Sequence, residues 1–158
     1  MFDVNVATQS ERGMLGIAMS THKNGATYVF LYYTEAKVEG SDICPKPNRC
    51  ERENEPLGNR LYRYELINDK LVNPKLLLDL PATPGAIGNS GKILLGPHDK
   101  NVYIAIGGVG INGHQTKAQN VQNGRDPAGT SSILVITQDG KEAIKNGRAV
   151  FLAIIKIL

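Results

Sequence analysis

Tryptophan is absent from this 158-residue chain, and only six tyrosines and three phenylalanines supply large aromatic rings. Glycine, by contrast, occurs 17 times, which suits a β protein with many turns. A chain of this length is ordinarily one domain with enough material for a sizeable core. Composition therefore favours a single turn-rich β domain.

An excess of charge of one sign is also missing, because 18 Lys and Arg residues face 15 Asp and Glu residues, a net charge of +3. So small and dispersed a surplus indicates neither nucleic acid nor an anionic membrane as a partner. The longest apolar run, residues 149 to 155, is far shorter than the roughly 20 residues needed to cross a bilayer. The opening residues 1 to 5 are acidic where a secretory leader is basic, so no signal peptide is expected in them.

Cysteine is scarce, and both residues, Cys44 and Cys50, lie in one proline-containing loop. Such an even pair at short spacing is a disulfide candidate, which would indicate an oxidising compartment. Closing so small a loop would stabilise the fold by about 2 kcal/mol in the chain-entropy model. The alternative is a pair of reduced thiols in a cytosolic loop. Two cysteines with no histidine nearby cannot complete a tetrahedral zinc site, and we expect no metal there.

The most informative stretch runs from Gly85 to Gly108. It reads as a glycine-rich entry, a short apolar strand, a polar turn at residues 97 to 100, a second strand over 102 to 106, and another glycine cluster. Both strands are apolar on successive residues, which predicts a hairpin covered on both faces. Its end loops lack bulky side chains, so a ligand could dock against the backbone there.

A similar hairpin is expected over residues 13 to 34, turning at Asn24-Gly25, since Asn-Gly accepts positive φ at low cost. Each hairpin is followed by a long polar loop and a further strand. The first of these, residues 59 to 66, alternates, which predicts an exposed face carrying Arg63 and Glu65. A further strand is expected over residues 76 to 80. The strand that follows the long loop after the central hairpin is expected at residues 132 to 137. His22, His98 and Asp139 fall in turns and are expected to be solvated.

The two halves repeat with a period of roughly 75 residues, longer than an ordinary propeller blade because of the inserted loops. The predicted fold class is all-β, a partial β-propeller of about two four-stranded antiparallel blades that cannot bury both faces alone. We expect one incomplete domain over residues 1 to 158, with blade 1 at about 11–80 and blade 2 at about 91–158. Residues 148 to 158 are continuously apolar, and we expect truncation or a shifted reading frame after about residue 142. An unusually apolar closing strand is the alternative.

The central hairpin also carries a resemblance. Together with residues 11 to 16, it resembles the N-terminal part of the soluble PQQ-dependent glucose and sorbosone dehydrogenases, quinoprotein sugar dehydrogenases with a six-bladed β-propeller. Two positions depart from the family pattern: Gly88 stands at its histidine and Gly108 at its aspartate. The matching segments are Asn89-Ser90-Gly91-Lys92-Ile93, Gly96-Pro97, Val102-Tyr103 and Ile106-Gly107.

In that family PQQ accepts a hydride from the sugar while a histidine, whose pKa lies near working pH, takes the hydroxyl proton. A bound Ca²⁺ stabilises charge on the quinone. The resemblance implies a sugar dehydrogenase fragment with no catalytic residue of its own, since Gly88 cannot titrate. PQQ and Ca²⁺ are not expected to bind this chain alone, because the family's arginines and calcium ligands come from later blades. The remaining substrate-side or cofactor-side candidates are Glu11, Gly88, Asn89, Gly108 and His114.

Two other functions stay open. Three copies could close a six-bladed ring that covers the exposed sheet edges and binds sugar without oxidising it. Alternatively, His114 or Glu11 could act as the base in such an assembled ring. In each case the expected partner is a small sugar, not nucleic acid. The resemblance and the cysteine pair together predict an extracytoplasmic location.

Overall fold

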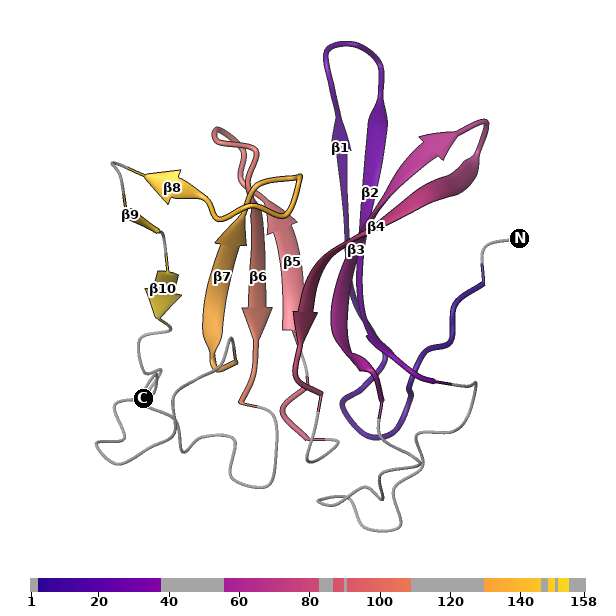
Figure 1. The fold of residues 1–158 in the computed structure, drawn as a ribbon, viewed down its shortest axis with the longest axis vertical. Coiled ribbons are helices and arrows are strands. Elements are labelled where there is room, and N and C mark those ends of the chain that lie inside the picture. Colours follow the sequence, from indigo (N-terminus) through magenta and orange to yellow (C-terminus); the bar gives the residue numbers. More distant parts are fainter. Residues whose placement is uncertain are drawn as a thin grey trace.

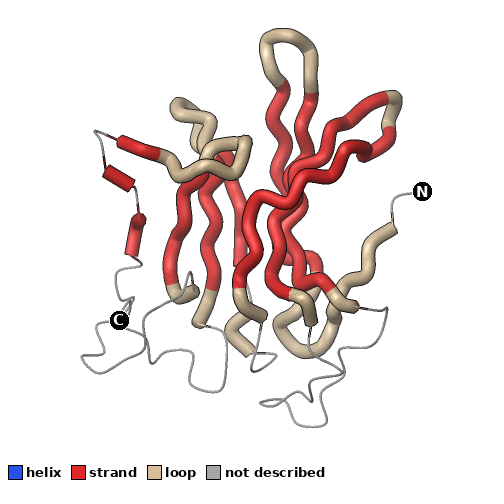
Figure 2. Tube along the Cα trace, viewed as in Figure 1, coloured by secondary structure: helices blue, strands red, loops and turns tan. Residues whose placement is uncertain are grey.

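The computed structural model describes residues 3–37, 56–82, 87–89, 91–108, 130–145, 148–149 and 151–153. Within these ranges every regular element is a β-strand (Figures 1 and 2). They include no helix long and apolar enough to span a membrane. Three residues singled out from the sequence, Cys44, Cys50 and His114, lie outside the described residues.

The first sheet is a four-stranded antiparallel meander in which each strand pairs with the next one in sequence. Gly25, with φ of 86°, turns the chain as the Asn-Gly pair predicted. Asn68 and Asp69 make the next turn, with φ of 49° and 59°, because these side chains tolerate the left-handed region. The strands are β1 (Met14–Thr21), β2 (Thr27–Glu35), β3 (Gly58–Ile67) and β4 (Lys70–Leu80).

The second sheet is also four-stranded and antiparallel, in the order β10-β7-β6-β5. Its fourth strand, β10, pairs with β7 from within the apolar C-terminal stretch, so part of that stretch does form a closing strand. The all-β class with two four-stranded antiparallel sheets is therefore confirmed. The strands are β5 (Gly91–Leu95), β6 (Val102–Ile106), β7 (Ser132–Ile136) and β10 (Phe151–Ala153); β8 (Ile144–Lys145) pairs separately with β9 (Arg148–Ala149).

The two sheets meet through β1 and β5, which lie side by side (Figure 1). Gly16 makes this approach possible, since a Cβ there would lie 3.0 Å from Cγ1 and 3.1 Å from the backbone nitrogen of Ile93. Behind this contact both sheets contribute side chains to one core. Its buried members are Phe30, Tyr32, Leu61, Leu77, Leu80, Ile93, Val102, Ile104, Ile106, Leu134 and Ile136.

A second, smaller core covers the opposite face of the first sheet, where Val29, Leu31, Tyr33 and Tyr64 are buried. The N-terminal segment packs there and is held by backbone hydrogen bonds of 2.9 Å from Ala7 N to Thr34 O and from Ala36 N to Asn5 O. Strand β2 therefore buries alternate side chains on both faces. This burial explains why its sequence is aromatic and β-branched throughout.

Two expectations about exposed faces are wrong. Leu61, on the same side of β3 as Arg63, is fully buried in the core between the sheets, so that side of β3 faces the second sheet and not solvent. Conversely, Leu94 and Lys92 of the central hairpin are exposed, although the apolar run predicted cover on both faces. The outward face of the second sheet carries no further β layer among the described residues, which leaves Leu94 open.

Candidate functional site

Three segments meet at the end of the sheets where β1 and β5 begin and β6 ends (Figure 1). The backbone N–H of Gly88 donates a hydrogen bond of 2.6 Å to Oε2 of Glu11. Gly88 has φ of 79°, a conformation that favours glycine. A Cβ on Gly107 would lie 2.6 Å from the carbonyl oxygen of Gly88, so the glycine cluster after β6 packs directly on this segment. Of the predicted site residues, Glu11 and Gly88 are thus in contact, and Gly108 follows the glycine that touches Gly88.

Asn89 anchors this segment and does not face solvent. Its Oδ1 accepts a hydrogen bond of 2.8 Å from Nδ2 of Asn59, which also donates to the carbonyl of Pro81 at 2.8 Å. Oδ1 of Asn59 in turn accepts a bond of 2.6 Å from the hydroxyl of Thr34. Asn59, Asn89 and Thr34 are all fully buried. A buried polar network of this kind fixes one arrangement, because breaking any bond leaves an unsatisfied group in the interior.

Arg12 is a further structural residue that the sequence did not single out. It is buried, and its guanidinium donates a hydrogen bond of 3.2 Å to the carbonyl of Ala82, just after β4. Arg12 thereby fixes the turn that carries Glu11. Ser131 N bonds to Gly107 O at 3.0 Å and secures the glycine cluster from the other side. Local sequence patterns gave no signal for Arg12 or Asn59, because their partners lie far along the chain.

The chemistry available at this end is that of a carboxylate and a backbone amide. Gly88 and Gly108 bring no side chain, and Glu11 is exposed and uses one oxygen to accept from Gly88. Ca²⁺ takes six to eight oxygen ligands, and the described residues contain no group of three or more His, Cys, Asp or Glu side chains that could hold a metal. These residues by themselves therefore do not fit Ca²⁺. The arrangement can accept hydrogen bonds from a neutral hydroxyl-bearing ligand at Glu11.

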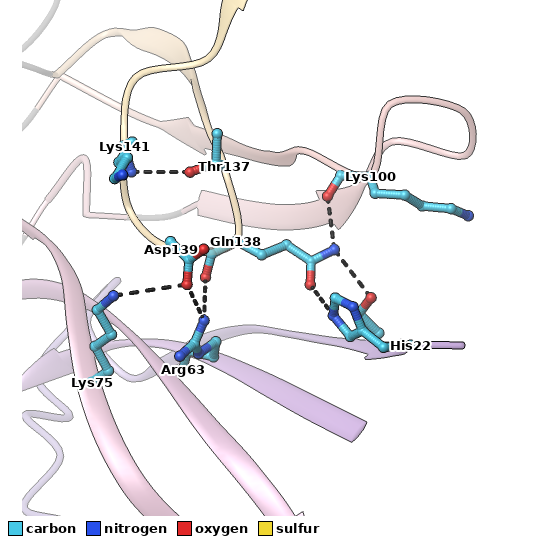
Figure 3. A network of polar contacts seen from close by, with 9 residues as sticks. His22, Arg63, Lys75, Lys100, Thr137, Gln138, Asp139 and Lys141 are labelled. Carbon is cyan, nitrogen blue, oxygen red and sulfur yellow. Dashed lines mark hydrogen bonds and ion pairs between the residues drawn. The ribbon is translucent and has the colours of Figure 1, made fainter. Parts of the chain in front are cut away.

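The opposite end of the sheets is fastened by the turn after β7 (Figure 3). Nε2 of Gln138 donates to Ser20 Oγ at 3.1 Å and to the carbonyl of Lys100 at 2.9 Å. Its Oε1 lies 2.9 Å from Nε2 of His22, within hydrogen-bond distance. One side chain thus joins β1, the turn after β1 and the turn between β5 and β6. His22 is exposed, as expected for a turn residue, but it is engaged in this contact.

Arg63 adds a charged link at the same end. It donates to the carbonyl of Gln138 at 3.1 Å and to Oδ1 of Asp139 at 2.6 Å, and its guanidinium lies 4.3 Å from the ring centroid of Tyr28. Lys75 lies 3.8 Å from the same Asp139 oxygen. The hydrogen bond from Arg63 holds the pKa of Asp139 below its usual value. Asp139 is solvated as the sequence predicted, yet it also tethers the second sheet to the first.

A third polar cluster lies on the outward face of the first sheet. Glu35 accepts a bond of 2.7 Å from the Tyr62 hydroxyl and one of 3.1 Å from Arg60, which also pairs with Asp79. Burial and the bond to Glu35 raise the pKa of Tyr62 to about 12. Tyr62 also stacks on Tyr33 with ring centroids 5.6 Å apart. These contacts hold β2, β3 and β4 together on the side away from the second sheet.

Comparison with known proteins yields one structural likeness. No protein-family model matches the sequence, and no curated protein matches it. A crystal structure from Thermus thermophilus, provisionally assigned as an oxidoreductase (glucose dehydrogenase), superimposes with a TM-score of 0.65 and 22% sequence identity. The match covers 92% of this chain and 37% of that protein. At this identity the likeness shows the fold, which is that of the predicted partial propeller.

Proposed function

We propose that this chain forms two adjacent blades of a sugar-oxidising β-propeller of the PQQ-dependent glucose and sorbosone dehydrogenase type, and that these blades contribute substrate binding only. The observation that carries the proposal is the contact between Glu11 and Gly88, which joins the two segments that resemble that family. The fold likeness to a protein assigned as a glucose dehydrogenase supports it.

The proposed division of labour follows from the residue types at this end. Glu11 has a second carboxylate oxygen that can accept a hydrogen bond from a sugar hydroxyl, while the glycines at 88 and 108 keep the backbone accessible. Neither glycine can take a proton, and loss of a general base typically lowers the rate by about 10² to 10⁴. Proton transfer and cofactor binding would therefore depend on residues outside these two blades.

The backbone amide of Gly88 is a direct reporter for this proposal, because it bonds to the proposed ligand contact. Titrating the ¹⁵N-labelled chain with glucose should shift the Gly88 resonance, and Glu11→Ala should abolish the response. Glu65→Ala is the matched control, since Glu65 lies toward the far end of β3 and bonds to Asn73. An unchanged Gly88 resonance at saturating sugar, in a folded protein, would contradict sugar binding at this end.

Turnover separates the oxidoreductase reading from a non-catalytic sugar-binding module. With PQQ, Ca²⁺, glucose and an electron-accepting dye, we expect no dye reduction above the rate of PQQ alone. Turnover by the isolated chain would contradict the proposed dependence on other residues. Binding without turnover in every assembled state would favour the sugar-binding module.

We also propose an extracytoplasmic location, supported by the resemblance and by the cysteine pair. Thiol titration that finds two reduced cysteines in native protein would count against it.

A further inference from the structure

The turn between β1 and β2 places an asparagine directly before a glycine on an open part of the surface. Gly25 N donates a hydrogen bond of 2.9 Å to His22 O, and His22 N donates one of 2.8 Å to Ala26 O. Asn24 and Gly25 are both exposed. A Cβ on Gly25 would have no heavy atom within 4 Å apart from its own chain neighbours. No other described part of the chain therefore packs on this side of the turn.

The side-chain amide of Asn24 is held along the Gly25 backbone. Ala26 N donates a hydrogen bond of 3.1 Å to Oδ1 of Asn24, so the side chain folds forward along the chain and spans the intervening residue. A donor on Oδ1 also stabilises the negative charge that this oxygen gains when a nucleophile attacks Cγ. Gly25 has no side chain to obstruct attack by its own backbone nitrogen. The local structure therefore favours reaction of the Asn24 amide with the next peptide nitrogen.

The turn after β7 has the same backbone conformation and provides a comparison inside the molecule. Gly140 N donates a hydrogen bond of 3.0 Å to Thr137 O, and a second bond of 2.8 Å closes the turn as in the first one. The φ angle of Gly140 is 83°, against 86° at Gly25. Asp139 thus occupies the position that Asn24 occupies in the first turn.

Asp139 is restrained in ways that the residue in the first turn is not. Its Oδ1 accepts a hydrogen bond of 2.6 Å from Arg63, and Lys75 lies 3.8 Å from the same oxygen. An ionised carboxylate held by two cations is a poor electrophile. A Cβ on Gly140 would lie 3.2 Å from Cδ2 of Leu77, so this turn packs against β4. Of the two turns, the one between β1 and β2 is therefore the reactive one.

We propose that Asn24 is a site of spontaneous covalent modification, at which the side-chain amide becomes a carboxylate in the folded protein. The Gly25 nitrogen loses its proton to solvent base and bonds to Cγ of Asn24, the Cγ–Nδ2 bond breaks, and ammonia leaves. Water then opens the five-membered imide at either carbonyl, which yields aspartate or isoaspartate at this position. Water is the only co-reactant, and nothing is oxidised or reduced. The inference uses the β1–β2 turn alone and does not depend on the proposed function.

The product changes the end of the sheets that Gln138 fastens (Figure 3). His22 belongs to the same turn as Asn24, and its Nε2 lies 2.9 Å from Oε1 of Gln138. Conversion places a new negative charge two residues from His22, and isoaspartate also lengthens the backbone of the turn by one methylene. The modification therefore acts beside a contact that joins the two sheets.

Peptide mapping by mass spectrometry tests the proposal after the folded chain is incubated at mildly alkaline pH and digested in acid, which stops the reaction. The readouts are the mass gain from replacing an amide by a carboxyl group and the presence of isoaspartate. We expect Asn24 to be converted several-fold faster than Asn68, which is also exposed in a turn but precedes aspartate. Asn24→Gln should abolish the mass gain, because the longer side chain would have to close a six-membered ring. Separate peptides report on Asn112, Asn123 and Asn146, which also precede glycine but lie outside the described residues.

Asp139→Asn separates the structure of the turn from the Asn-Gly sequence. The variant has a second Asn-Gly pair in the same backbone conformation, but its side-chain oxygen can still accept from Arg63. The amide of Lys141 bonds to Thr137 Oγ1 at 3.1 Å and is not available to that oxygen. We expect position 139 to be converted several-fold more slowly than Asn24 in the same molecule. Equal rates would overturn the proposal, and so would an unmodified Asn24 in the folded chain over a period in which the urea-denatured chain is converted.

Discussion

Replacing Tyr32 by phenylalanine is expected to stabilise the protein, although the change removes a polar group from its core. Tyr32 is fully buried between the sheets, and its hydroxyl has no hydrogen-bond partner among the described residues. Burial accordingly raises the pKa of this phenol above its usual value. The hydroxyl gives up water on folding and gains nothing in return, which makes it a net cost to the folded state.

The size of the effect follows from two opposing contributions. An unsatisfied buried polar group costs about 1 to 3 kcal/mol, and removing the oxygen recovers this cost. The space left behind, roughly 10 Å³, costs only about 0.2 kcal/mol at about 24 cal/mol per Å³. We therefore expect Tyr32→Phe to raise the free energy of unfolding by about 1 to 3 kcal/mol. For a domain of this size that corresponds to roughly 2 to 12 °C in Tm.

Tyr33→Phe provides the matched control, because Tyr33 is the next residue on β2, is also buried, and faces the opposite core. Its hydroxyl is hydrogen-bonded with Tyr64, so the same substitution should lower the free energy of unfolding by about 1 kcal/mol. Urea titration and calorimetry of both variants measure the difference. If Tyr32→Phe destabilises the protein as much as Tyr33→Phe, the Tyr32 hydroxyl has a partner such as an internal water, and the reasoning fails.

Three further predictions concern the contacts between the sheets. Gly16→Val should lower Tm sharply by pushing β1 away from Ile93, whereas Thr21→Val, at the exposed end of the same strand, should not; calorimetry compares them. Asn59→Ala should lower the free energy of unfolding, measured by urea titration, by about 1 to 3 kcal/mol and should speed hydrogen exchange at the Asn89 amide. Unchanged exchange would show that Asn59 does not hold the Asn89 segment in place. The pKa of Asp139 is lower in the folded protein than its unfolded value near 3.9, so the ionised carboxylate stabilises the fold above that value, and this contribution is lost as pH falls through the folded pKa. Asp139→Asn should therefore reduce the fall of Tm with decreasing pH in the acid range. An unchanged fall would exclude the pair with Arg63.

The central hairpin was predictable because its information is local. Apolar runs, a Gly-Pro turn and flanking glycines specify β5 and β6, and the second strand was placed at the residues where the structure has it, Val102–Ile106. The first strand begins at Gly91, two residues before the apolar run, since backbone pairing extends past the side chains that pack. Turn chemistry also located the hairpin at Gly25.

What could not be predicted depends on partners distant in sequence. Local alternation assigned Arg63 to a solvated face, but its partner Asp139 lies 76 residues further on, and only the packing of the two sheets brings them together. Asn59 likewise resembles an ordinary residue at the start of a strand, and Asn89 was predicted as a substrate-side or cofactor-side residue, whereas the fold buries the two against each other. The contact between Glu11 and Gly88 in the candidate site was indicated only by the resemblance, which placed both residues at the same end of the sheets. The roles predicted for Asn89 and Gly108 remain predictions.

The polar fastenings at both ends of the core between the sheets have a consequence for assembly. Gln138 and Arg63 bridge the sheets at one end, while Glu11 and Asn59 bind the Gly88 segment, which leads into β5, at the other. With the apolar core between these bonds, the angle of one blade to the next is set within a single molecule, before any neighbour arrives. The two blades are therefore already ordered relative to each other before a further blade packs against them, which lowers the entropic cost of completing a closed propeller.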